Sequence, residues 1–344
     1  MTATRKLPVT MRVLTLTLLG LTGCNRPDTP EKPPGLRATL DGHSKVRRIA
    51  FSPDGKTLAV GSETQDIRVW DLETNTERFR LENTANAQAL VFSPKGRTLA
   101  TACAEPRIRF WDTASGREKT SYDGDIGNVM LLAFHPDGST LASWSEQKFW
   151  KAQVLFWDTA SGKQKDPLHL ATGFTNSLGF SPDGRTLAVA RMDPDGVDFW
   201  DLKTRTRRFV SMNASKTGFG NGWVGEVFFC RDGRRMAFYA EETVVRLWNL
   251  DKPKEESVFE VSGRAKYPNT ALRLDGKLAA VGDANGILTL WDLETGKKAA
   301  VVQASRGHIP DAYFSPDGRT MVTHEILESS VKIWDVPILI GKGK

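Results

Sequence analysis

The sequence predicts an all-β fold built from seven repeated units, each made of four short antiparallel strands. A Trp-Asp pair, once replaced by Trp-Asn, occurs seven times at intervals of 41 to 48 residues. A second motif, Phe-Ser-Pro-Asp-Gly in its most complete form, lies about 20 residues ahead of each pair. Self-similarity with a period of this length is typical of repeat folds, and no amphipathic helix pattern appears after residue 24.

The first 23 residues are expected to be a targeting signal rather than part of the fold. Arg5, Lys6 and Arg12 precede an apolar run, Val13–Leu21, and small residues come directly after it. This is the order of a secretory signal, and the run is too short to span a bilayer as a helix. The segment Leu-Thr-Gly-Cys that ends at Cys24 resembles the bacterial lipoprotein box. That resemblance implies cleavage before Cys24 and a diacylglycerol on its sulfur. An ordinary signal with an unrelated cysteine is the alternative.

Residues 24–35 are predicted to be the lipidated cysteine and a proline-rich tether. Four prolines in a polar stretch, at positions 27, 30, 33 and 34, favour an extended chain that cannot bury apolar surface. The signal also carries half of the net charge, which is +6 for the whole chain and +3 for residues 24–344. A charge this small gives no reason to expect binding to nucleic acid.

Each repeat has two turn motifs between short apolar runs. The runs Val46–Phe51, Thr57–Val60, Ile67–Trp70 and Arg78–Leu81 have the length and composition of strands. In Ser-Pro-Asp-Gly, the Pro fixes φ at the second turn position and the Gly accepts a positive φ, which predicts a tight hairpin. The Asp after each Trp can accept backbone N–H groups of the second turn.

Both motifs can be located in all seven repeats. The Trp pairs are Trp70-Asp71, Trp111-Asp112, Trp157-Asp158, Trp200-Asp201, Trp248-Asn249, Trp291-Asp292 and Trp334-Asp335. The hairpin motif is complete at residues 51–55, 180–184 and 314–318. At 92–96 a lysine replaces the Asp of the motif. The copies at 134–138, 229–233 and 272–276 depart from the motif at other positions.

These motifs resemble the WD-repeat β-propeller family, which implies a seven-bladed β-propeller of four-stranded antiparallel blades over residues 36–336, with a short tail at 337–344. Members of that family often have a buried polar network, in which the histidine of a Gly-His pair is joined to an Asp six residues before the Trp. This chain departs from that pattern. Gly-His remains only at 42–43 and 307–308, and the Asp position holds Thr64, Glu105, Lys151, Pro194, Glu242, Asn285 and Glu328. The network is therefore expected to be absent or rudimentary. A propeller family similar to the periplasmic Tol component shares the hairpin motif but lacks regular Trp-Asp pairs.

The last repeat lacks a fourth strand of its own, because the chain ends soon after Trp334-Asp335 and Pro337 interrupts the few residues that remain. The apolar run Leu36–Leu40 belongs to no other repeat. We expect it to supply the missing strand and so to close the ring.

Candidate chemistry is sparse. The histidines at 43, 135, 169, 308 and 324 have no metal-ligand spacing and are expected to be structural or on the surface, with a metal shared by His43 and His308 as the weaker alternative. The glycine-rich segment 218–222 is expected to be a loop, and the hairpin acids such as Asp54 to be turn formers. Cys103 and Cys230 lie three repeats apart, too far for a disulfide. No cofactor is predicted.

Two loops carry aromatic residues that the repeat does not explain. Trp144, Trp150 and Trp223 lie outside the Trp-Asp pairs, and the repeat is lengthened at 145–151 and at 213–223. Both connections should emerge on one face of the ring, two blades apart. This predicts a partner-binding surface of Phe149, Trp150, Phe219 and Trp223, unless these side chains fold back as local plugs.

Together these features predict a non-catalytic, monomeric protein-interaction scaffold, held by its lipid on the periplasmic side of a bacterial cell envelope. The alternative is a propeller enzyme or ligand binder of hydrolase, lyase or redox-cofactor type that uses the central channel. An enzyme would place converging His, Asp and Glu at the channel mouth, whereas a scaffold would place aromatic and mixed-charge loops there. The sequence favours the scaffold, although the fold alone does not define a function.

Overall fold

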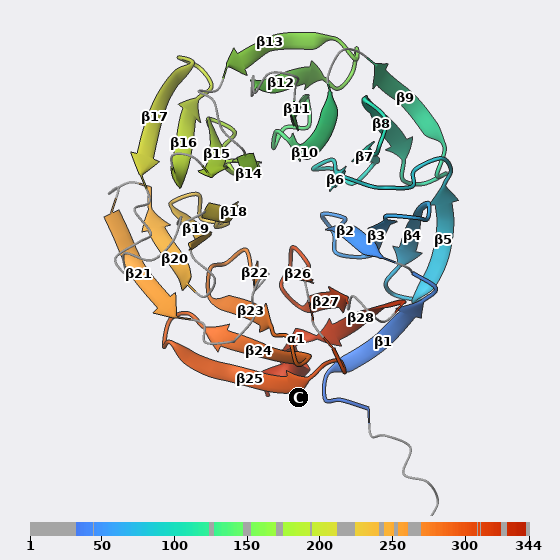
Figure 1. The fold of residues 1–344 in the computed structure, drawn as a ribbon, viewed down its shortest axis with the longest axis vertical. Helices are drawn as coiled ribbons and strands as arrows, with labels where there is room; N and C mark the ends of the chain where they lie inside the picture. The colour runs from blue at the N-terminus through green and yellow to red at the C-terminus, as the bar shows by residue number, and fades with distance from the viewer. Residues whose placement is uncertain are drawn as a thin grey trace, which may run out of the picture. The chain divides into compact units, whose positions relative to one another are not determined.

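The computed structural model describes residues 32–43, 45–123, 127–146, 153–169, 175–192, 195–211, 224–240, 244–250, 254–260, 270–307, 309, 311–324 and 329–341. Within residues 33–344 the described strands form seven four-stranded antiparallel sheets, arranged around a common centre (Figure 1). The predicted seven-bladed β-propeller is confirmed. We number the blades 1 to 7 in chain order.

The first strand of each blade lies nearest the centre and the fourth lies on the rim (Figure 1). Blade 1 comprises β2 (Val46–Phe51), β3 (Thr57–Ser62), β4 (Ile67–Asp71) and β5 (Thr76–Leu81). Blade 2 comprises β6 (Ala89–Phe92), β7 (Thr98–Ala102), β8 (Arg107–Asp112) and β9 (Glu118–Asp123). Blade 3 comprises β10 (Asn128–Phe134), β11 (Thr140–Glu146), β12 (Gln153–Asp158) and β13 (Gln164–His169).

The next three blades repeat this order. Blade 4 comprises β14 (Thr175–Phe180), β15 (Thr186–Met192), β16 (Asp195–Asp201) and β17 (Thr206–Ser211). Blade 5 comprises β18 (Val224–Phe229), β19 (Arg235–Ala240), β20 (Val244–Asn249) and β21 (Lys254–Glu260). Blade 6 comprises β22 (Thr270–Leu272), β23 (Leu278–Gly282), β24 (Ile287–Asp292) and β25 (Lys297–Gln303).

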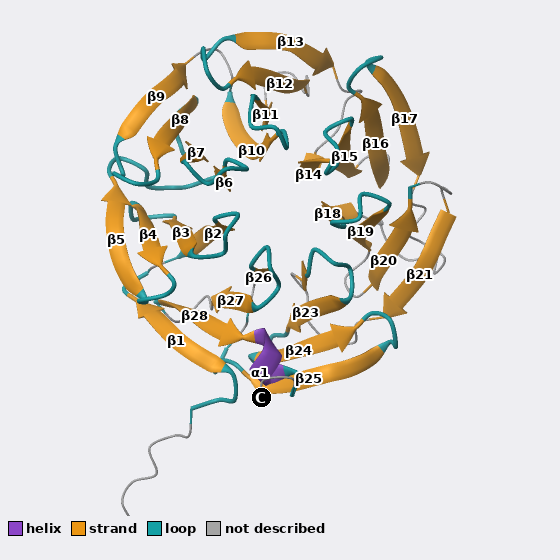
Figure 2. Cartoon of the chain, turned by 180° about the vertical axis from the view of Figure 1, so that it is seen from behind, coloured by secondary structure: helices purple, strands orange, loops and turns teal. Residues whose placement is uncertain are grey.

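Blade 7 is completed by the N-terminal end of the propeller. It comprises β26 (Asp311–Phe314), β27 (Thr320–His324), β28 (Ser330–Asp335) and, on the rim, β1 (Leu36–Asp41). β1 pairs antiparallel with β28, with Leu40 opposite Val331 and Asp41 opposite Ser330 (Figure 2). The predicted closure by Leu36–Leu40 is thus confirmed, and backbone hydrogen bonds join the two ends of the ring.

A single helical turn, α1 (Val336–Leu339), comes after blade 7, where the sequence suggested only a tail. The Asp335 carboxylate accepts a hydrogen bond from the Ile338 N–H, and Pro337 lies in the first turn, where a missing N–H is tolerated. Four residues are too few to show a helical period, which explains why the sequence did not reveal α1. Among the described residues, no helix has the length and apolar character needed to cross a membrane.

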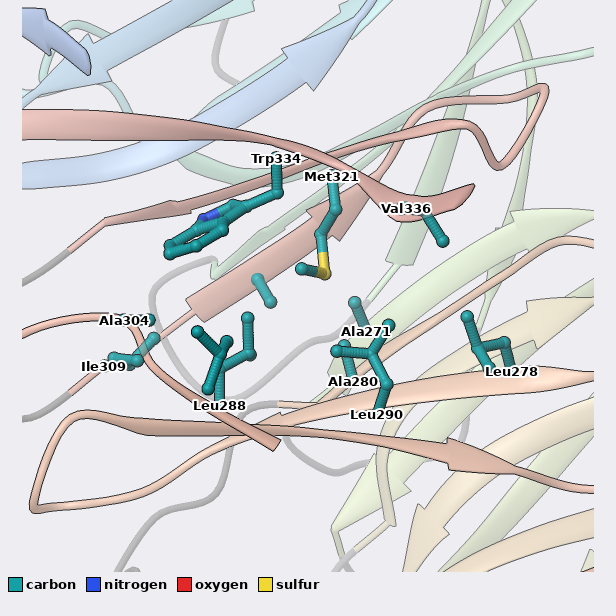
Figure 3. Packing of buried hydrophobic residues seen from close by; sticks show 12 residues of the cluster. Ala271, Leu278, Ala280, Leu288, Leu290, Ala304, Ile309, Met321, Trp334 and Val336 are labelled. Atoms are coloured by element: carbon teal, nitrogen blue, oxygen red, sulfur yellow. The ribbon is translucent and has the colours of Figure 1, made fainter. Parts of the chain in front are cut away.

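The core consists of apolar layers between neighbouring blades. Between blades 6 and 7, Trp334 and Met321 face Leu288 and Leu290, and all four side chains are almost fully buried (Figure 3). The alternation of strand residues places one face of each sheet against the preceding blade and the other against the next. Every blade is therefore held by both of its neighbours.

The repeat tryptophans show how little remains of a polar network in the described blades. Trp111, Trp157 and Trp334 donate their indole N–H to Thr101, Ser143 and Thr323 on the second strand of the same blade, at 2.8–3.0 Å. At the equivalent second-strand position the other four blades have Val60, Val189, Phe238 and Val281. In those blades the indole nitrogens of Trp70, Trp200, Trp248 and Trp291 are buried without a hydrogen-bond partner.

Candidate functional site

The ring has two faces that differ in their connections. We call the face with the connections from second to third strands and from one blade to the next the loop face. The opposite face carries the Ser-Pro-Asp-Gly hairpins and the turns after each Trp, and we call it the turn face. This assignment follows from the antiparallel order of all four strands in each sheet.

The predicted binding residues Phe149, Trp150, Phe219 and Trp223 lie outside the described residues, as does the predicted lipidation site Cys24. The strand ends that flank the two aromatic segments are described. β11 and β12 are paired up to Ser145 and Gln153, and β17 ends at Ser211 before β18 begins at Val224. These strand ends lie on the loop face.

Trp144 is the one surplus tryptophan that the structure describes. Its side chain is 5% exposed and packs in the cluster that contains Phe156, Leu168 and Trp200. It therefore belongs to the core between blades 3 and 4 rather than to a binding surface.

On the turn face the hairpin acids act within their own turns, as predicted. The Asp54 carboxylate accepts hydrogen bonds from the Ser52 hydroxyl at 2.5 Å and from the Lys56 N–H at 3.0 Å. Asp183 and Asp317 repeat this arrangement in blades 4 and 7. Burial alone raises the pKa of Asp54, but these hydrogen bonds outweigh it and lower the pKa.

One hairpin residue also joins two blades. His135 Nε2 lies 3.0 Å from the carbonyl oxygen of Gly184 in the next blade, and because a carbonyl only accepts, the ring must donate. Gly184 has φ +71°, and a Cβ at this position would lie 2.3 Å from His135 Nε2. Only glycine fits here. His135 is therefore a structural histidine, as the sequence predicted.

The described residues of the turn face line three grooves between successive blades that the sequence did not reveal. They lie between blades 2 and 3, 3 and 4, and 4 and 5, with volumes of about 300, 400 and 280 Å³. Each has a pair of phenylalanines among its lining residues: Phe110 with Phe134, Phe156 with Phe180, and Phe199 with Phe229. One phenylalanine precedes a repeat Trp, and the other begins the next hairpin motif.

The sequence signal for these grooves was present but divided between two repeats. Phe immediately before the repeat Trp occurs only in blades 2, 3 and 4, as Phe110, Phe156 and Phe199. Each pairs with the hairpin Phe of the following blade, so the pattern becomes visible only when adjacent blades are placed side by side.

Cross-strand charges lie on the third and fourth strands beside the repeat Trp. Arg68 forms an ion pair with Glu77, and its guanidinium lies 4.5 Å from the Trp70 ring centroid. Arg109 repeats this with Glu118 and Trp111. Both arginines also donate to backbone carbonyls at or just after the end of the preceding rim strand, Arg68 to Asp41 and Arg109 to Glu82 and Asn83, which ties the loop face to the third strand.

Blade 4 has an acid, Asp198, at the third-strand position that Arg68 and Arg109 occupy in blades 1 and 2. Asp198 is fully buried, and its Oδ2 lies 3.4 Å from Arg191 and 3.6 Å from Arg207. Burial raises the pKa of Asp198, although both arginines act to lower it. Asp198 and Arg191 line none of the three grooves, whereas Arg207 also lines the groove between blades 4 and 5.

His43 is the buried remnant of the Gly-His motif. Its side chain has no exposed surface and packs against Trp70 at a centroid distance of 5.5 Å, with the two rings tilted by 52°. Neither ring nitrogen has a hydrogen-bond partner among the described residues. Burial, with Arg68 nearby, lowers its pKa to about 4. The expectation of a rudimentary network is confirmed in blade 1. His308 lies outside the described residues.

The two cysteines within the propeller, Cys103 and Cys230, are both buried. Cys103 is buried, its Sγ lies 3.3 Å from the Thr84 carbonyl, and burial raises its pKa to about 12. Neither Cys103 nor Cys230 is in a disulfide, as predicted. Within the part of the chain that the structure describes, no group of three or more His, Cys, Asp or Glu side chains is placed to hold a metal ion.

Comparison with known proteins supports the repeat identity. The model for "WD domain, G-beta repeat" matches residues 35–71 and 80–112, which are the first two Trp-Asp repeats. The chain is 29% identical over 141 residues to WD repeat-containing protein SL1-17 of Schistosoma mansoni, across 40% of this chain and 42% of that protein. It is 40% identical over 78 residues to small ribosomal subunit protein RACK1 of Medicago sativa, across 22% and 23% of the two chains. The matched part is less than half the length of either relative.

A solved structure shows the same fold. The β-propeller domain of Cps50 (Swd1) from Myceliophteria thermophila superposes with a TM-score of 0.74 at 17% identity, over 88% of this chain and 99% of that domain. The chain is therefore a seven-bladed β-propeller whose first two repeats match the WD repeat.

Proposed function

We propose that this protein is a non-catalytic interaction scaffold, a WD-repeat propeller that presents partner-binding loops on a closed, rigid ring. The observation that carries the proposal is the pairing of β1 with β28, which ties all seven sheets into one platform. Loops on a rigid scaffold are positioned for binding at little entropic cost.

The similar proteins support this reading through their names. One is a protein of the small ribosomal subunit, and another is WD repeat and SOCS box-containing protein 1 of Takifugu rubripes, 30% identical over 78 residues. The first name places that relative in a macromolecular assembly. We extend to this chain only the general role of binding protein partners.

We place the partner surface on the loop face, at Phe149, Trp150, Phe219 and Trp223. This placement is supported by the strand ends that flank the two aromatic segments, because Ser145, Gln153, Ser211 and Val224 lie on that face. Aromatic side chains contribute a large share of the binding energy at protein interfaces.

The test is a double substitution, Trp150→Ala with Trp223→Ala, in the full-length protein. Quantitative crosslinking and mass spectrometry of envelope preparations should show loss of the wild-type partner set, while the melting temperature stays within about 2 °C. Val301→Ala is the matched control, because Val301 is a 58% exposed apolar side chain on the rim strand β25. A lower melting temperature with unchanged capture per folded molecule would show that the tryptophans are plugs.

We also propose that the scaffold is held at the bacterial cell envelope, on the periplasmic side, by lipid on Cys24. Two acyl chains give stable membrane anchoring. The Cys24→Ser variant should lose metabolic labelling with palmitate and move to the soluble fraction, with Cys103→Ser as the thiol control. Retention of the variant in salt-washed membranes would contradict the anchor.

A further inference from the structure

The hairpin of blade 2 has a basic residue at the motif position where every other hairpin has an acid. Lys95 occupies the position that is an acid in each of the other six copies, namely Asp54, Asp137, Asp183, Asp232, Asp275 and Asp317. The neighbouring motif positions, Ser93, Pro94 and Gly96, are unchanged. The difference is therefore a charge reversal at a single position in an otherwise regular turn.

This reversal removes local stabilisation. In blade 1 the equivalent carboxylate accepts a side-chain and a backbone hydrogen bond within the turn, from Ser52 and Lys56. An ammonium group cannot accept either bond. Lys95 also forms no ion pair with an acid in the described structure, and its side chain is exposed. A residue that breaks a local rule without a compensating contact is typical of a functional site.

Lys95 lies on the rim of the groove between blades 2 and 3. Arg97 and Lys119 line the same groove and, among the described residues, are likewise not paired with an acid. Lys119 contributes only a long contact of 3.4 Å to the Thr98 hydroxyl. Phe110 and Phe134 lie deeper, with ring centroids 6.5 Å apart at an interplanar angle of 78°.

The one acid that lines this groove, Asp137, is already engaged. Its carboxylate lies 2.7 Å from the Ser139 N–H and 2.8 Å from His135 Nδ1. Burial raises its pKa, but these hydrogen bonds prevail and lower it to about 2. The groove is therefore lined by three cationic side chains and by one carboxylate that is already hydrogen-bonded.

The other two grooves are balanced in charge. The lining between blades 3 and 4 contains Lys165 and Arg205 together with Asp137 and Asp166. The lining between blades 4 and 5 contains Arg207 and Arg208 together with Asp183 and Asp201. Among these three grooves, the excess of positive charge is thus confined to the one between blades 2 and 3, and the repeat itself does not produce it.

We propose that this groove binds an acidic peptide segment of a partner protein. An apolar side chain of the peptide packs against Phe110 and Phe134, and flanking carboxylates meet Lys95, Arg97 and Lys119. A small inorganic anion would leave the two phenylalanines unused, whereas a peptide uses both the apolar floor and the basic rim. The groove is on the turn face, so this site is separate from the loop-face surface and stands independently of it.

The experiment measures binding of a fluorescein-labelled Asp-Glu-Phe-Glu-Asp peptide to the full-length protein by fluorescence anisotropy. Lys95→Asp and Arg97→Asp should each weaken binding by about tenfold or more, since both reverse a charge at the rim. Arg319→Asp is the matched control, because Arg319 is the exposed residue equivalent to Arg97 in blade 7. It should change the dissociation constant by less than about twofold.

Lys95→Asp also separates binding from folding. It restores the acid of the other six turns, so the melting temperature should stay equal or rise while binding falls. Comparable loss in Arg319→Asp would show a general electrostatic effect and overturn the site. Equal affinity for the peptide Asp-Glu-Ala-Glu-Asp would also overturn the site, because the phenylalanine would then contribute nothing. Full displacement of the peptide by millimolar phosphate, or preferred binding of phosphatidylglycerol vesicles through the same residues, would overturn it as well.

Discussion

At the scale of single residues, one second-strand position decides whether the repeat tryptophan is hydrogen-bonded. Thr101, Ser143 and Thr323 accept the indole N–H of their blades, whereas Val60 and its apolar equivalents leave it without a partner. A buried donor without a partner is destabilising by about 1–3 kcal/mol. The described blades therefore depend on apolar packing more than on this polar pair.

Thr101→Val should reduce the free energy of unfolding by about 1–3 kcal/mol, because it leaves the Trp111 indole N–H buried without an acceptor. The reverse exchange in blade 1, Val60→Thr, offers an acceptor to Trp70 and should be neutral or stabilising. Urea denaturation of both variants checks this. Equal destabilisation by both would mean that side-chain shape, and not the hydrogen bond, governs this position.

His43 makes stability depend on pH. Its pKa is about 6.5 when unfolded and about 4 when folded, because burial disfavours the charged ring. Between these values the unfolded chain binds the extra proton, so stability is fully present above pH 6.5 and falls as the pH drops toward 4. The contribution is about 3 kcal/mol at most.

His43→Phe keeps a ring against Trp70 and removes the titrating group. The difference in unfolding free energy between wild type and variant should change across pH 4–6.5 and level off above it. Chemical denaturation at a series of pH values measures this difference. A difference that is the same at every pH would contradict the assignment.

At the scale of strands, charge placement distinguishes blade 4 from its neighbours. Asp198 is held by Arg191 and Arg207, whereas blade 1 has Ser62 at the position of Arg191 and blade 3 has Leu155 at the position of Asp198. The cluster is a local alternative to the arginine–glutamate pairs of blades 1 and 2.

Asp198→Ala should destabilise the protein by about 3–5 kcal/mol, because it removes the carboxylate that forms an ion pair with the buried Arg191. The double variant Arg191→Ser with Asp198→Leu introduces the residue types that blades 1 and 3 have at these positions. It should lose much less stability, since both buried charges are removed. The midpoints of urea unfolding compare the two. Equal losses would show that packing, not charge, holds this part of the sheet.

The sequence was sufficient for features that repeat and insufficient for features that lie between repeats. The Trp-Asp period predicted seven blades, and the unclaimed run Leu36–Leu40 predicted the strand that closes the ring. The grooves were missed because Phe110 and Phe134 belong to different blades. The charge of Lys95 was visible in the sequence, but its meaning depended on finding Arg97 and Lys119 around the same groove.

At the scale of the whole molecule, two faces with different chemistry share one ring. The turn face presents grooves between blades 2 and 5, and the loop face is where the aromatic segments begin and end. Both proposed surfaces require neighbouring blades to keep a fixed spacing. That spacing depends on the β1–β28 pairing, which is the one place where the ring is closed by residues from opposite ends of the chain.

Disulfide trapping of this closure is the most direct test. Thr39 and Lys332 are register partners, so the Thr39→Cys, Lys332→Cys variant should form one bridge within a single chain, seen by non-reducing peptide mass spectrometry. Thr39→Cys with Ser330→Cys, two positions out of register, should not, and the buried Cys103 and Cys230 should stay reduced in both. A bridge between two chains, or bridges formed equally in both variants, would contradict the closed ring.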